Sequence, residues 1–143
     1  MKAKNFFSEE QQQSIINAIS SAELNTSGEI RLHLVDSCKD DPKSAAVLTF
    51  EKSGMTQTKL RNGVLIYMAV IDKKFAIIGD KGINDVVPAD FWDSIKDDMT
   101  LEFKNSNFEK GLISGIEKIG EKLKTHFPFS ENDKNELNND ISF

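Results

Sequence analysis

Two carboxylates and one side-chain amide follow an apolar run near the middle of this sequence. The run at 75–78 (FAII) leads into Gly79, Asp80, Gly82, Asn84 and Asp85. An unbroken apolar run is typical of a strand covered on both faces, so these polar residues lie where the chain leaves the core. Carboxylate and amide oxygens are ligands of Ca²⁺ and Mg²⁺, and glycines permit positive φ or close approach of the backbone to a ligand. The alternative is a strand-to-helix turn built from ordinary turn residues.

Other kinds of chemistry have little support in the chain. Cys38 is the only cysteine, which excludes an intrachain disulfide and a cysteine zinc site, and His33 and His126 stand in no catalytic pattern. The net charge of −5 argues against nucleic acid as a partner. No signal peptide and no run of 18 apolar residues is visible, so we expect a cytoplasmic protein without a membrane span. The length of 143 residues predicts one domain.

The elements that must position these residues can be read from periodicity and capping signals. Helices are expected from Ser8 to about 24, from Asp41-Pro42 to about 59, from Val87-Pro88 through Met99, and from a Ser106–Glu109 capping box to about 127. Strands are expected at 29–35, 64–71 and 74–79. Glycines at 111, 115 and 120 in the last helix suggest close packing on a neighbour. Residues 129–143 are expected to form a polar, disordered tail after a domain spanning 1–128.

Strand direction brings three polar segments together. A helix joins the first two strands, which makes them parallel, and a short turn makes the third strand antiparallel to the second. The starts of the first two strands and the end of the third therefore lie at one edge, where residues 26–29, 61–63 and 79–85 form a rim. Glu29, Asp80 and Asp85 can direct three carboxylates at one cation there. Arg61 offers the competing explanation, a purely structural ion pair with one or more of them.

The same segments resemble the TPM-domain family. The blocks are TSGEI at 26–30, RNGVLI at 61–66, GDKGI at 79–83, VP with FW at 87–92, and the closing stretch 111–128, all in order. The resemblance implies a three-layer α/β/α sandwich around a small mixed β-sheet. Known relatives include thylakoid-lumen proteins of photosystem repair, with acid phosphatase activity and divalent-cation binding described for them. Many relatives carry a signal peptide and a transmembrane helix, which this sequence does not show.

Three functions remain open from the sequence. The leading hypothesis is a divalent-cation-binding TPM-domain protein, with Ca²⁺ first and Mg²⁺ second, ligated by Asp80, Asp85, Glu29 and Asn84. The first alternative is a metal-assisted phosphatase at the same rim, with Arg61 stabilising charge, although no nucleophile motif is visible and catalysis stays undecided. The second is a protein-interaction module in which the metal only steadies a loop.

Overall fold

The sheet is built from β1 (Glu29–Val35), β2 (Gly63–Ala69) and β3 (Lys74–Gly79) in that spatial order. The computed structural model describes residues 2–129 and 139–143. β1 and β2 are parallel, and β2 and β3 are antiparallel. Glu29 lies opposite Gly63, and Val64 lies opposite Gly79, so the starts of β1 and β2 and the end of β3 share one end of the sheet. The rim predicted from strand direction is therefore present.

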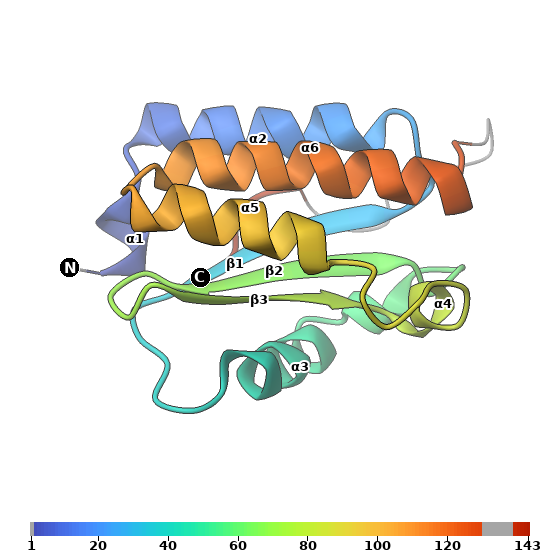
Figure 1. The fold of residues 1–143 in the computed structure, drawn as a ribbon, viewed down its shortest axis with the longest axis horizontal. Coiled ribbons are helices and arrows are strands. Elements are labelled where there is room, and N and C mark those ends of the chain that lie inside the picture. The colour runs from blue at the N-terminus through green and yellow to red at the C-terminus, as the bar shows by residue number, and fades with distance from the viewer. Residues whose placement is uncertain (1, 130–138) are drawn as a thin grey trace.

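Helices cover both faces of this sheet (Figure 1). α2 (Glu9–Glu23), α5 (Asp93–Lys104) and α6 (Phe108–His126) lie on one face, and α3 (Pro42–Lys52) lies on the other. All seven residues of β2 are buried, as expected for an apolar strand between two layers. The predicted three-layer α/β/α sandwich with a small mixed sheet is confirmed.

The core is divided by the sheet into a larger and a smaller apolar cluster. The larger one packs the three helices against side chains such as Ile30, Leu32 and Ile66, each of which is fully buried. Each such side chain contributes about 1.5–3 kcal/mol relative to an exposed one. The smaller one packs Ala46 and Phe50 of α3 against the other face. The strands are thereby held on both sides, which fixes the rim.

The glycines of α6 are sites of close helix packing, as the sequence suggested. A Cβ on Gly115 would lie 2.6 Å from Sδ of Met99 in α5, and one on Gly120 would lie 2.8 Å from Cβ of Ala22 in α2. Both distances are shorter than van der Waals contact. α6 therefore approaches two neighbouring helices at positions where only glycine fits without a shift.

Several helix boundaries differ from the predictions. α3 ends at Lys52, because Gly54 adopts φ 72°, and a short helix η1 (Met55–Gln57) follows. α5 begins at Asp93 rather than near Pro88, and residues 86–92 form turns. The Ser106–Glu109 capping box does not form, since Ser106 has φ 62° and Asn107 is the N-cap of α6. By contrast, the Ser8–Gln11 capping box of α2 forms in full.

Two short helices were not predicted. α1 (Ala3–Phe6) precedes α2, and its Ala3 amide donates to Oδ1 of Asp36 at 2.6 Å. α4 (Lys81–Asn84) lies inside the 79–85 loop. Both contain four residues, which is too short for the helical periodicity that sequence analysis detects.

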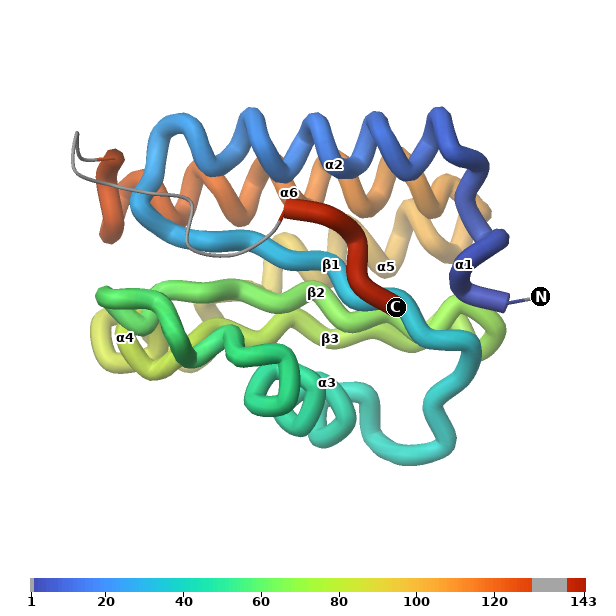
Figure 2. The backbone as a smooth tube through the Cα atoms, turned by 180° about the vertical axis from the view of Figure 1, so that it is seen from behind, coloured from blue at the N-terminus to red at the C-terminus, as the bar shows by residue number. Residues whose placement is uncertain are grey.

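The end of the chain lies alongside β1 (Figure 2). The Leu34 amide donates to the carbonyl of Ser142, and the Ser142 amide donates to the carbonyl of Leu32, both at 2.9 Å. Ile141 is only 8% exposed and belongs to the larger cluster. The disordered tail expected for 129–143 falls partly on residues 130–138, which lie outside the described residues. Residues 140–143 differ from that expectation, because their backbone pairs with an edge strand.

Candidate functional site

The loop after β3 is shaped by Asp80, which begins the short helix α4. Its Oδ1 accepts the Lys81 amide at 2.7 Å, and its backbone carbonyl accepts the amides of Ile83 and Asn84 at 3.0 and 3.1 Å. Aspartate is a favoured N-cap because its short carboxylate reaches the first free amides of a helix. The carboxylate of Asp80 is thereby fixed at the end of the sheet, and the residue is only 5% exposed.

Arg61 binds this buried carboxylate in a bidentate ion pair. Its Nε donates to Oδ2 of Asp80 at 2.7 Å, and its Nη2 donates to Oδ1 at 2.9 Å. The hydrogen bond with Asp80 raises the pKa of the Arg61 guanidinium above its ordinary value. The two parallel contacts match the planar fork of arginine to both oxygens of the carboxylate. The structural ion pair that the sequence left as an alternative is formed.

Gly82 allows the loop to lie directly on the chain that precedes β2. A Cβ at this position would lie 2.1 Å from the Leu60 carbonyl oxygen and 2.7 Å from that of Arg61. The Gly82 amide donates to the Arg61 carbonyl at 2.9 Å. The close approach expected of this glycine is thus made to backbone. The other role considered for Gly79 and Gly82 was a positive φ angle. Neither glycine adopts it, and among the glycines of the described residues only Gly54 does.

Asn84 and Asp85 point to partners within their own loop. Nδ2 of Asn84 donates to the carbonyl of Gly79 at 3.0 Å, which closes the loop behind β3. Asp85 forms an ion pair with Lys81 at 3.3 Å, with both side chains mostly exposed. Asp80 and Asp85 therefore each have a separate cationic partner. The loop alone does not gather its carboxylates around a common point.

Glu29 lies on the same rim but is paired with Glu23, which the sequence analysis did not single out. Glu29 is 3% exposed at the start of β1, and Glu23 is half-buried at the end of α2. Their side chains hydrogen-bond each other, and Oε2 of Glu23 also accepts the Ile30 amide at 2.7 Å. Asn139 donates a further hydrogen bond to Glu23. Two acidic side chains thus meet between α2, β1 and the C-terminal segment.

The environment of this pair favours a bound proton. Burial is the main cause that raises the pKa of Glu23 to about 8, and the charge and hydrogen bond of Glu29 raise it further. The Ile30 amide and Asn139 act in the opposite direction. The position of Glu23 in the sequence was one indication of a special role. An acidic residue in the last turn of a helix interacts unfavourably with the helix dipole, so its presence there calls for a reason other than helix stability.

A buried amide oxygen lies directly before the neighbouring strand β2. Asn62 is 1% exposed, and its Nδ2 donates to Oγ of Ser27 at 3.2 Å. Its Oδ1 has no hydrogen-bond partner among the described residues. The Glu29 amide donates to the backbone carbonyl of Asn62 at 3.3 Å, so the backbones of these two residues are adjacent. A buried carbonyl oxygen without a donor is a candidate ligand for a hard cation.

The assembled rim thus contains two separate acidic centres. One is Asp80 with Arg61, and the other is the Glu23–Glu29 pair beside Asn62. Within residues 2–129 and 139–143, no group of three or more histidine, cysteine, aspartate or glutamate side chains is placed to hold a metal ion. Among the same residues, no helix has the length and apolar character needed to span a membrane.

Comparison with known proteins defines the class. The family model of the TPM domain matches residues 1–122, and the chain belongs to this family. It is similar to the BA42 protein of the psychrophilic bacterium Bizionia argentinensis, at 50% identity over 99% of this chain and 97% of that chain, with a TM-score of 0.92. No curated protein sequence matches the chain.

Two more distant structures share the fold. The N-terminal domain of a protein from P. gingivalis is 16% identical, with a TM-score of 0.70, over 86% of this chain and 80% of that chain. The N-terminal domain of the cg2496 protein from Corynebacterium glutamicum is 13% identical, with a TM-score of 0.66, over 82% and 74%. The resemblance drawn from the sequence blocks is confirmed as family membership.

Proposed function

We propose that this TPM-domain protein binds a divalent cation, with Ca²⁺ preferred over Mg²⁺, at the end of the sheet where β1 and β2 begin. The observation that carries the proposal is the pair of Glu23, which is half-buried, and Glu29, which is buried, in which two carboxyl groups hydrogen-bond each other. Such a pair is stable only with a shared proton or with a cation in its place. Glu29 was among the ligands proposed from the sequence. In the present proposal Glu23, and not Asp80, is the carboxylate that binds the cation together with Glu29.

The neighbouring oxygen atoms suit a calcium ion. Oδ1 of Asn62 is a neutral oxygen, and two carboxyl groups supply the charge. Ca²⁺ takes six to eight oxygen ligands in flexible geometry, often with backbone carbonyls and water completing the set, whereas Mg²⁺ demands a regular octahedron. Two carboxylates from different elements, with an amide nearby, suit the more tolerant ion.

The second acidic centre is less suited to the ion. Asp80 already has a bidentate guanidinium partner, so a cation there would have to displace Arg61. Asp85 is 61% exposed at its side chain and pairs with Lys81. Asp80, Asn84 and Asp85 therefore enter the proposal as outer groups of the rim, and Glu23 and Glu29 enter it as direct ligands.

The experiment is a titration of chelator-treated, ¹⁵N-labelled protein with CaCl₂ and separately with MgCl₂, followed by amide NMR shifts. We expect saturable shifts at residues 23–30 and 62–63, with the larger response to Ca²⁺. Glu23→Gln and Glu29→Gln should each weaken Ca²⁺ binding by about tenfold or more, as removal of a charged ligand predicts. Asp85→Asn is the matched control, since its carboxylate is already paired and exposed.

Two results would contradict the proposal. One is the absence of saturable shifts with either ion. The other is a response confined to residues 79–85 or to residues 130–138 and unaffected by Glu29→Gln. Affinity should also increase as the pH rises toward about 8, because Ca²⁺ competes with the proton held by the pair. A pH-independent affinity would place the ion elsewhere.

The phosphatase alternative has no specific support in the geometry. It assigns Arg61 to a transferring phosphoryl group, yet Nε and Nη2 of Arg61 already donate to the carboxylate of Asp80. The interaction-module alternative likewise lacks a defined partner surface at the rim. We therefore keep cation binding as the proposed function.

A further inference from the structure

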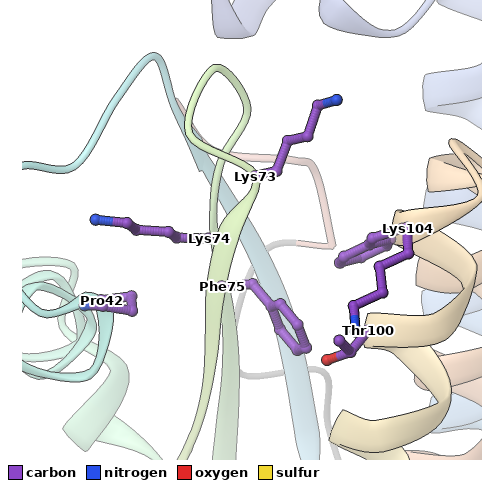
Figure 3. Close-up of a pocket in the computed structure, with 7 residues that line it drawn as sticks. Pro42, Lys73, Lys74, Phe75, Thr100 and Lys104 are labelled. Carbon is purple, nitrogen blue, oxygen red and sulfur yellow. The ribbon is translucent and has the colours of Figure 1, made fainter.

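A pocket of about 350 Å³ lies at the opposite end of β3 from the rim. It opens between the first residues of β3, the last turns of α5 and the start of α3. Figure 3 shows it extending around the outer edge of the strand, with Pro42 on one side and Thr100 on the other. A volume of this size accommodates a ligand of one or two rings. The lining residues that matter are Pro42, Lys74, Phe75, Thr100, Phe103 and Lys104.

The floor of the pocket is aromatic. The rings of Phe75 and Phe103 meet edge to face, with centroids 5.1 Å apart and an interplanar angle of 78°. Phe103 is only 5% exposed and packs in the larger core cluster, while Phe75 is half-buried. A strand and a helix therefore hold the two rings in place. An aromatic ring of a ligand can make favourable edge-to-face or offset contacts with this wall. Because the two phenylalanine rings are already held in place, binding does not have to order them first.

The mouth of the pocket is cationic in a protein whose net charge is −5. The side chain of Lys104 runs from α5 toward Thr100 and the Phe75 ring, and Lys74 extends on the Pro42 side (Figure 3). Neither ammonium group has an ion-pair partner among the residues that the structure describes. Lys73 also lines the pocket but turns its ammonium toward the ring of Phe108, at 5.8 Å from the centroid.

Acidic residues at this end of the sheet are engaged with backbone. Oδ2 of Asp72 accepts the Cys38 amide at 2.6 Å, and Oδ1 of Asp36 accepts the Ala3 amide at 2.6 Å. Oδ2 of Asp41 caps α3 by accepting the Ser44 amide at 3.2 Å. These carboxylates satisfy amides rather than the two lysines. The pocket thus combines apolar walls with two available positive charges.

We propose that this pocket is a binding site for a small aromatic anion, such as an aryl carboxylate. The ring of the ligand packs on Phe75 and Phe103, and its anionic group binds the ammonium of Lys104, with Lys74 as a second cation at the entrance. Lysine on an edge strand is common protection against aggregation, which accounts for Lys74 alone. It does not account for Lys104, which lies on α5 and extends toward Thr100 and the Phe75 ring on the other side of β3.

The test uses 2-naphthoate as the probe, with ¹⁵N-labelled protein in a chelator-containing buffer, so that it is independent of the proposed cation site. We expect saturable amide shifts at residues 73–75 and 100–104, with a Kd of about 1 mM or tighter. Lys104→Met, which keeps the apolar stem, should weaken binding by about tenfold, the typical loss for a charged hydrogen-bond donor. Lys96→Met on the same helix is the matched control and should bind as the unaltered protein does.

Two companion probes separate the contributions. Acetate carries the charge without the ring, and 2-naphthylmethanol carries the ring without the charge. Both should bind at least about tenfold more weakly than 2-naphthoate if the two halves of the pocket act together. Three results would overturn the proposal. The first is that acetate or 2-naphthylmethanol binds as tightly as 2-naphthoate, and the second is that Lys96→Met weakens binding as much as Lys104→Met does. The third is the absence of saturable shifts at residues 73–75 and 100–104.

Discussion

Asp80 and the Glu23–Glu29 pair show two ways in which the fold accommodates buried carboxyl groups. The carboxylate of Asp80 forms an ion pair with the guanidinium of Arg61 and accepts a hydrogen bond from the Lys81 amide. Glu23 is paired with another acid, and burial raises its pKa to about 8. The first arrangement stabilises a loop whatever is bound, whereas the second depends on a proton or an ion. This difference makes the glutamate pair the more informative target for mutation.

Glu23→Gln should change how stability depends on pH in cation-free buffer. The pKa of Glu23 is raised from 4.5 to about 8 by folding, so the folded protein keeps a proton that the unfolded chain releases between these values. The stability that this group contributes is full below pH 4.5 and is lost as the pH rises through about 8. The variant lacks this loss, and it should exceed the unaltered protein by about 1–3 kcal/mol near pH 8.

Urea unfolding at several pH values between about 5 and 8 measures this effect. Glu10→Gln is the control, since Glu10 lies exposed in the first turn of the same helix. Parallel stability curves for Glu23→Gln and the unaltered protein would show that the glutamate pair holds no proton of this kind.

At the scale of elements, the rim depends on backbone contact between the 79–85 loop and the chain before β2. Gly82 makes this contact possible, and Arg61, which has φ 51°, supplies both the accepting carbonyl and the guanidinium that binds Asp80. The short helix α4 is thus held at its start by a side chain and along its side by backbone. Displacement of this helix would alter both contacts at once.

Gly82→Ala should be strongly destabilising, by about 1–3 kcal/mol or more, because the added Cβ meets backbone that cannot rotate away. The predicted contact with the Leu60 carbonyl oxygen is 2.1 Å. Gly79→Ala is the matched control in the same loop, since its Cβ would meet its neighbours at 3.4 Å or more. Urea midpoints measure the difference, and amide shifts at residues 60–62 locate it. Equal midpoints for the two variants would refute the close approach.

Sequence periodicity identified the long elements because each buries one continuous face. Strand directions followed from the types of connection, and they correctly place Arg61 and Asp80 at the same end of the sheet. Helix boundaries were less predictable where the same short sequence pattern is compatible with either a helix cap or a turn. Ser106 and Glu109 have the spacing of a capping box, but Ser106 occupies a left-handed turn between α5 and α6. The pairing of Glu23 with Glu29 depends on side-chain directions across a helix-to-strand turn, which spacing does not encode.

At the scale of the whole molecule, the two edges of the sheet differ. The β1 edge is closed by residues near the end of the chain, through hydrogen bonds between Leu34, Leu32 and Ser142. The β3 edge borders the aromatic pocket at one end and α4 at the other. Ile141 joins the C-terminal segment to the core, and Asn139 joins it to Glu23. The segment therefore links the apolar core with the proposed cation site.

Ile141→Ala should lower the free energy of unfolding by about 2–4 kcal/mol, within the range for truncation of a buried isoleucine. Hydrogen exchange at the Leu34 amide should become faster, since its acceptor is the Ser142 carbonyl. Phe143→Ala is the control, because Phe143 is 44% exposed. Unchanged exchange at Leu34 in the Ile141 variant would show that the segment is not held by its apolar contact.

The position of residues 140–143 also bears on synthesis. Their partner strand β1 is made early, whereas these residues are translated after every helix and the other strands of the domain. Throughout that interval the β1 edge has no partner from this segment, and an unpaired edge is a site for association with other chains. Nascent chains that stop short of residue 140 should therefore depend more on chaperones than chains that include residues 140–143 do.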